Sequence, residues 1–135
     1  MNKSELKRIE FGELRLGHKS RENLEDCWNT SWASSGPKVK EFEFEWSKLF
    51  GYQYSKAVSS GTDAVINLVM SLYDYDAQRG DEVIVPALSF IATSNAVLHA
   101  GFIPKFVDIE NHTLNINPDL IEAAIGPKTR AILMV

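Results

Sequence analysis

The second half of the sequence alternates short apolar runs with stretches of helical periodicity, and this alternation restricts the fold more than any other feature. The apolar runs, each typical of a strand, cover residues 56–59, 82–85, 104–107 and 131–135. The predicted helices between them cover residues 62–73, 91–100 and 118–125. Strands that alternate with helices over connections of this length form a parallel sheet covered by helices. The sequence therefore predicts an α/β fold, with the almost entirely apolar helix 62–73 buried beside the sheet.

The first part of the sequence predicts helices without strands. Residues 20–32 have helical spacing, and the run Ser34-Ser35-Gly36-Pro37 ends that helix. A second helix follows, because apolar residues then recur on one helical face: Val39, Phe42, Trp46, Leu49 and Phe50. Gly51 is suited to end it. Residues 1–19 show no clear period, and we expect an extended arm or a loop there.

Composition excludes several classes of protein. The net charge of −4, with basic and acidic residues interspersed, provides no basic stripe for a nucleic acid. Cys27 is the single cysteine, so neither an internal disulfide nor a cysteine-based metal site is expected. No apolar stretch approaches the ~20 residues of a membrane span, and the first residues lack the apolar core of a signal peptide. We expect a cytoplasmic protein with no metal, membrane or nucleic-acid partner.

The stretch from Val58 to Ala64 predicts a strand that continues through a small turn directly into a helix. The backbone N–H groups at a helix start have no partner within the helix, and the helix dipole adds roughly half a positive charge there. Gly61 would let an anion approach the backbone closely, and the hydroxyls of Ser60 and Thr62 could donate hydrogen bonds to it. The turn is therefore a candidate phosphate site, although the same residues also suit ordinary helix capping.

Two further observations bear on this turn. Asp63 lies in the first helical turn, where an acid suits the helix dipole but would repel a phosphate if its side chain pointed toward the ligand. Neither a Gly-x-Gly-x-x-Gly run nor a Gly-x-x-x-x-Gly-Lys-Ser/Thr run occurs in the sequence, which argues against a dinucleotide or a nucleoside triphosphate. The phosphate of a smaller cofactor suits the turn better.

A second candidate element follows the strand at residues 82–85. Pro86 ends this strand, and the residues up to Phe90 then lie at the carboxyl edge of the sheet, where open α/β folds bind ligands. Phe90 could offer a flat face to an aromatic cofactor. The alternative is that Phe90 is part of the core.

These segments resemble those of a known family in their residues and in their order along the chain. The matching motifs are Gly36-Pro37-x-Val39, Ser59-Ser60-Gly61-Thr62-x-Ala64, Gly80-Asp81-Glu82-Val83-Ile84-Val85-Pro86, Ala100-Gly101-Phe102-Ile103-Pro104-x-Phe106-Val107-Asp108-Ile109 and Lys128-Thr129-Arg130-Ala131-Ile132. Together, residues 42–135 resemble the DegT/StrS type of sugar-nucleotide aminotransferase, a branch of the fold-type-I enzymes that use pyridoxal 5'-phosphate (PLP).

The resemblance implies a fold and a cofactor site. The expected fold is the large domain of a fold-type-I PLP transferase, a three-layer sandwich with a mostly parallel sheet that this chain contains only in part. The implied cofactor-binding residues are Ser60, Gly61, Thr62 and Asp63 around the PLP phosphate and Phe90 stacked on the pyridine ring. In the family, the Schiff-base lysine and the aspartate that pairs with the pyridinium nitrogen belong to segments after Val135. We therefore assign no catalytic residue to this chain.

The resemblance also implies a domain division and a function. Residues 1–37 would form an amino-terminal arm and helix, and residues 38–135 the first part of the PLP-binding domain. Because residues 131–135 read as a buried strand with no tail, we expect a piece of a longer protein. That protein would be a homodimer that transfers an amino group, with glutamate as the expected donor, to a nucleotide-linked keto sugar in amino-sugar or polysaccharide biosynthesis. The alternatives are a PLP-dependent sugar dehydratase of the same fold and a noncatalytic, truncated binding protein.

Overall fold

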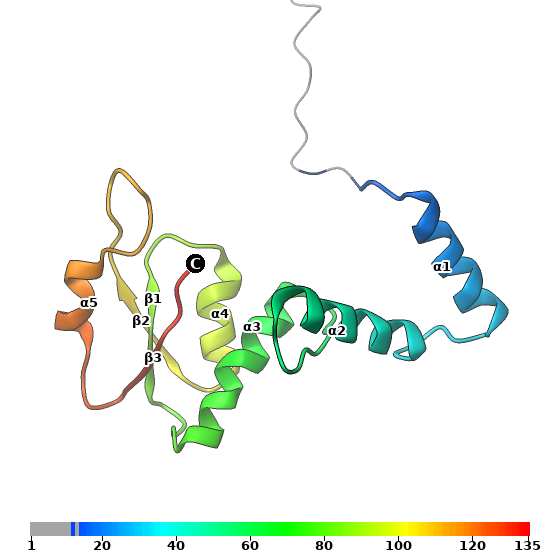
Figure 1. Ribbon diagram of the computed structural model, residues 1–135. Coiled ribbons are helices and arrows are strands. Elements are labelled where there is room, and N and C mark those ends of the chain that lie inside the picture. Colours follow the sequence, from blue (N-terminus) through cyan, green and yellow to red (C-terminus); the bar gives the residue numbers. More distant parts are fainter. Residues whose placement is uncertain (1–11, 13) are drawn as a thin grey trace, which may run out of the picture. The chain divides into compact units, whose positions relative to one another are not determined.

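The computed structural model describes residue 12 and residues 14–135, so most of the predicted arm lies outside the described residues. The chain forms two compact units, Met1–Ala57 and Val58–Val135, and each is described by itself (Figure 1). The sequence placed a domain division after residue 37 instead. The predicted division marks where the cofactor-binding domain begins, whereas the two compact units are defined by packing alone. The start of that domain at residue 38 therefore stays a prediction.

The first unit contains helices α1, His18–Asn29, and α2, Pro37–Phe50. Helix α1 ends before the predicted residue 32, because Ser31 adopts a left-handed conformation with φ of 54°. Helix α2 has the expected ends: proline occupies its first turn, and Gly51 caps it with φ of 71°. No apolar side chain is buried in the described part of this unit. The rings of Phe42, Trp46 and Phe50 instead form an exposed row on α2.

The second unit is built around a three-stranded parallel sheet. Its strands are β1, Glu82–Pro86, β2, Ile103–Val107, and β3, Thr129–Ile132, in the order β2-β1-β3. The central strand β1 aligns Glu82 with Ile103 of β2 and with Thr129 of β3. The predicted parallel sheet and α/β class are therefore confirmed. Strand β3 ends at Ile132, short of the predicted residue 135, although the N–H of Leu133 still donates to the carbonyl of Ile84 at 2.8 Å.

Helices cover both sides of this sheet. They are α3, Gly61–Met70, continued by the 3-10 helix η2, Ser71–Tyr75, then α4, Ile91–His99, and α5, Pro118–Ala124. Helices α3 and α4 pack against each other, and α4 contacts both β1 and β2. Helix α5 also contacts β2 and lies on the other side of the strands in Figure 1. The main core joins Val83 and Val85 of β1 to Val69 of α3 and Val97 of α4.

Two sequence predictions in this region are wrong. Residues 56–59 form no strand, because no other described segment pairs with them. The Glu43 carboxylate takes the place of a neighbouring strand for part of this segment: it accepts the N–H of Ala57 at 3.0 Å and pairs with Lys56 at 3.2 Å. The apolar helix 62–73 was expected to lie buried beside the sheet without a solvent face, yet only Val69 of α3 is buried, because the helix packs through one face.

Candidate functional site at the carboxyl edge of the sheet

The amino ends of α3 and α4 lie at the same end of the second unit. Tyr73, just after α3, donates its hydroxyl to the carbonyl of Ala100, just after α4, at 2.7 Å. The carboxyl ends of the two helices therefore lie together, and because the helices pack against each other, both begin at the same end of the unit. Helix α4 begins at Ile91, shortly after β1 ends at Pro86. We call this end of the unit, which includes residues 59–63 and 87–93, the carboxyl edge.

The turn before α3 presents unpaired donors at this edge. Ser60 is the N-cap: its hydroxyl oxygen accepts the N–H of Asp63 at 3.1 Å, and its carbonyl accepts the N–H of Ala64 at 3.0 Å. Among the described residues, no acceptor is in hydrogen-bond range of the N–H groups of Gly61 and Thr62. A methyl group placed on Gly61 would meet nothing within 4 Å, so the approach to these donors is open. Open N–H groups at a helix start suit a phosphate.

The carboxylate of Asp63 folds back onto the same turn. Its Oδ2 atom accepts hydrogen bonds from the hydroxyls of both Ser59 and Ser60, the second at 3.0 Å. The hydroxyl of Ser59, followed by that of Ser60, holds the pKa of Asp63 below its usual value of 3.8. The sequence analysis included Ser59 in the motif shared with the family but gave it no role at the site.

Phe90 stands on the surface at the carboxyl edge. It is the N-cap residue of α4, and 75% of its surface is exposed, so its ring is not part of the core. A hydrogen bond holds the loop around Phe90: the hydroxyl oxygens of Ser89 and Thr93 lie 2.8 Å apart, and Thr93 is buried. This hydroxyl pair was also missed, although its i, i+4 spacing at a helix start was visible in the sequence. An exposed phenylalanine over a fixed loop can stack on an aromatic ligand.

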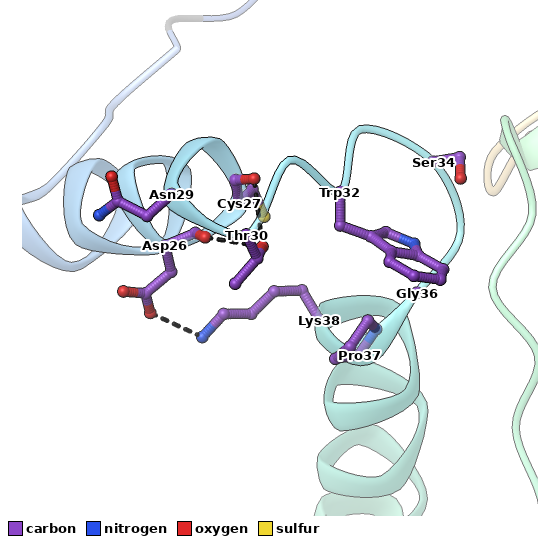
Figure 2. A pocket seen from close by; sticks show the side chains of 9 residues that line it. All are labelled: Asp26, Cys27, Asn29, Thr30, Trp32, Ser34, Gly36, Pro37 and Lys38. Carbon is purple, nitrogen blue, oxygen red and sulfur yellow. Dashed lines mark hydrogen bonds and ion pairs between the residues drawn. The ribbon is translucent and has the colours of Figure 1, made fainter.

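A cavity in the first unit has a different character. It has a volume of about 260 Å³ and lies where the chain bends between α1 and α2 (Figure 2). Trp32 packs onto Gly36 so closely that a methyl group there would overlap the indole ring. Lys38 reaches across the bend to Asp26 at 3.2 Å and also pairs with Glu41 on its own helix, which raises the pKa of Lys38. These contacts hold the bend and indicate no chemistry.

The described residues contain no group of three or more His, Cys, Asp or Glu side chains placed to hold a metal ion. None of their helices has the length and apolar character that crossing a membrane requires.

Comparison with known proteins places almost the whole described region in one family. Residues 15–135 match the DegT/DnrJ/EryC1/StrS aminotransferase family. The chain is 38% identical over 120 residues to the spore coat polysaccharide biosynthesis protein SpsC of Bacillus subtilis, a match that covers 89% of this chain and 30% of SpsC. The chain thus spans about a third of the length of the relatives it matches.

Solved structures agree with this match. Spr1654 of Streptococcus pneumoniae, a candidate sugar aminotransferase in its PMP form, superposes with a TM-score of 0.84 at 31% identity, over 93% of this chain and 31% of that one. The GDP-4-keto-6-deoxy-D-mannose-3-dehydratase of E. coli, with bound hydrated PLP, superposes with a TM-score of 0.82 at 30% identity, over 90% and 32%. The fold-type-I architecture implied by the motifs is therefore confirmed, and the chain belongs to the DegT/DnrJ/EryC1/StrS aminotransferase family.

Proposed function

We propose that the protein is a PLP-dependent sugar aminotransferase whose cofactor binds at the carboxyl edge. The observation that carries this proposal is the pairing of open N–H groups at Gly61 and Thr62 with the exposed ring of Phe90 at one end of the unit. A phosphate group and an aromatic ring, the two ends of PLP, require these two kinds of contact. Family membership and relatives solved with PLP or PMP support the same cofactor.

The residues of this chain would bind and orient the cofactor. The turn from Ser60 to Asp63 surrounds the phosphate, and the N–H groups of Gly61 and Thr62, with the Thr62 hydroxyl, donate to its oxygens. Phe90 stacks on the pyridine ring and excludes water from one face of it. Bound PLP supplies an electron sink for moving an amino group between substrates. The Schiff-base lysine and the aspartate at the pyridinium nitrogen would come from residues outside these 135.

The substrate proposed is a keto sugar linked to a nucleotide, with glutamate as the amino donor, in the synthesis of amino sugars or polysaccharides. Two relatives support this class: SpsC is named for polysaccharide biosynthesis, and the E. coli dehydratase is named for a GDP-linked keto sugar. We further propose a cytoplasmic homodimer in which residues 38–135 begin the cofactor-binding domain.

A sugar dehydratase is the second candidate. The specific observation in its favour is the TM-score of 0.82 to the E. coli dehydratase, close to the 0.84 found for Spr1654. The contacts to phosphate and ring would be the same in both enzymes. The residue at the Schiff-base position, lysine in aminotransferases and histidine in the dehydratases of this fold, would separate them.

The test uses the whole protein. As purified it should show the visible absorbance of PLP bound to a lysine, and hydroxylamine should abolish that band. Incubation with glutamate and nucleotide-linked keto sugars should then yield 2-oxoglutarate and an amino sugar, both identified by mass spectrometry. A product that has lost a hydroxyl group and gained no nitrogen would favour the dehydratase. An intact protein with neither bound PLP nor such a band would overturn the proposal in favour of a noncatalytic binding protein.

A further inference from the structure

The Asp63 carboxylate forms a small ring of hydrogen bonds with its own turn, and this ring bears on how the proposed phosphate site works. The N–H of Asp63 donates to the Ser60 hydroxyl oxygen at 3.1 Å, and the Ser60 hydroxyl donates to the Asp63 carboxylate at 3.0 Å. The Ser59 hydroxyl donates to the same carboxylate oxygen. One side chain therefore ties together three consecutive parts of the turn: the last extended residue, the N-cap and the first helical turn.

This ring determines which donors remain for a ligand. A serine hydroxyl carries a single proton, so a hydroxyl that donates to Asp63 cannot donate to a phosphate at the same time. The two serine protons are thus taken up by the Asp63 carboxylate. The groups still open at the carboxyl edge are the N–H groups of Gly61 and Thr62, together with the Thr62 hydroxyl, none of which has a partner among the described residues.

Asp63 is ionised near neutral pH, where it can accept both serine hydroxyls. The hydrogen bond from Ser59, followed by that from Ser60, holds the pKa of Asp63 below 3.8. An anionic side chain in the first turn also interacts favourably with the helix dipole of α3. Both effects stabilise the turn before any ligand arrives, which lowers the ordering cost of binding.

We infer that Asp63 is a positioning residue, which takes up the hydroxyls of Ser59 and Ser60 and thereby fixes the turn so that Gly61 and Thr62 alone face the phosphate. This inference rests on the proposed function and assigns the turn's residues to two roles. Ser59, Ser60 and Asp63 hold the backbone, and Gly61 and Thr62 contact the ligand. A directly binding Ser60 or a repelling Asp63 would each predict a different pattern of affinities.

The test is a double-mutant cycle on the whole protein, read as the dissociation constant for PLP in a titration of the cofactor-free form. Asp63→Ala should weaken PLP binding by about tenfold, and Asp63→Asn by less, because the amide oxygen still accepts a serine hydroxyl. Ser59→Ala should weaken binding about threefold when Asp63 is present and cause no further loss when Asp63 is alanine. Asp119→Ala, which removes an exposed acid from the first turn of α5, is the matched control and should leave PLP affinity unchanged.

Two outcomes of this cycle would overturn the inference. An equal loss from Ser59→Ala in both backgrounds would mean that Ser59 donates directly to the phosphate. Tighter PLP binding in both Asp63→Ala and Asp63→Asn would mean that Asp63 mainly repels the ligand. If the unchanged protein binds no PLP, the proposed function fails, whereas PLP binding without coupling between Ser59 and Asp63 overturns only the inference.

A second measurement needs no cofactor. In the cofactor-free protein, the amide hydrogens of Asp63 and Ala64 should exchange with solvent faster in Asp63→Ala than in the unchanged protein, with Asp63→Asn between them. Exchange that is unchanged in Asp63→Ala would show that the ring does not fix the turn, and the inference would be wrong.

Discussion

The polar groups at one end of the parallel sheet are paired with one another, whereas some of those at the other end have no partner among the described residues. At the end where β1 begins, which we call the amino edge, charged side chains pair with one another. The buried carboxylate of Asp81 accepts from Arg130 at 2.6 Å and from the N–H of Gln78 at 2.9 Å. Glu82 accepts from Lys105 at 3.1 Å and from Thr129 at 3.3 Å. These contacts connect β1 to both neighbouring strands.

At the carboxyl edge the hydrogen bonding is only partly complete. Ser59, Ser60 and Asp63 satisfy one another, but the N–H groups of Gly61 and Thr62 remain open and Phe90 is exposed. The same strands and helices run between the two edges, so the two edges differ only in the residues at the ends of these elements. The paired charges of the amino edge serve stability, whereas the open groups of the carboxyl edge support the proposed ligand site. Substitutions at the two edges should therefore separate stability from cofactor binding.

The largest effect should come from the core that both edges share. Ile84, in the middle of β1, is fully buried, and Ile84→Ala should lower the free energy of unfolding by about 2–5 kcal/mol, through lost burial and the cavity left behind. Denaturant unfolding of the cofactor-free whole protein would measure it. Molecules that remain folded should still bind PLP. A loss below about 1 kcal/mol would mean that the sheet is not the stabilising element.

A smaller loss of stability should follow at the amino edge. Arg130→Met removes the guanidinium that pairs with the buried Asp81 and should lower the thermal midpoint, while Arg130→Lys should retain part of the stability. The dissociation constant for PLP should stay within about twofold of the starting value. Lys48→Met, at an exposed position on α2, provides the control for loss of a positive charge. Comparable loss of PLP affinity and stability in Arg130→Met would remove the distinction between the edges.

The carboxyl edge should respond in the reverse manner. Phe90→Ala should weaken PLP binding about tenfold, because it removes a stacking contact, and Phe90→Trp should restore most of the affinity. The thermal midpoint of the cofactor-free protein should hardly change, since the ring is exposed. Ile91→Ala removes an adjacent, similarly exposed side chain and should leave the affinity unaltered. If Phe90→Ala binds PLP normally, the ring of Phe90 does not stack on the cofactor.

The smallest effect should appear only in acid. The N–H of Gln78 and then the guanidinium of Arg130 hold the pKa of Asp81 below 3.8. A carboxyl with a lowered folded pKa stabilises the fold above its unfolded pKa, and that contribution is lost as pH falls through the lower folded pKa. Unfolding midpoints measured below about pH 4 should therefore fall less steeply in Asp81→Asn than in the unchanged protein. Equal slopes would show that the contacts at the amino edge do not lower the pKa of Asp81.

The elements that obey local rules could be predicted from the sequence. Strands β1 and β2 are short apolar runs and lie within a residue of their predicted positions. Helix α2 lies between a proline that suits a helix start and a glycine that suits a helix end. The turn at Ser60 was recognised because a strand end, a glycine and hydroxyl residues occur there in immediate succession.

Features that depend on partners distant in sequence could not be predicted. Apolar residues at 56–59 indicate strand propensity but cannot show whether a neighbouring strand exists, and none does among the described residues. Asp81 and Arg130 are 49 residues apart, so only the folded sheet brings them together. The carboxylate of Asp63 could have pointed outward or onto its turn, and the sequence does not distinguish these directions.

The central claim is that the open N–H groups of Gly61 and Thr62 receive the phosphate of PLP. Amide hydrogen exchange of these two residues in the whole protein, measured with and without PLP, tests it most directly. The account predicts fast exchange in the cofactor-free protein, because both amides are unpaired, and marked slowing when PLP is bound. The matched amide is that of Asp119, which donates to Asn117 at the start of α5 and should not respond. Tight PLP binding with unchanged exchange at Gly61 and Thr62 would contradict the account.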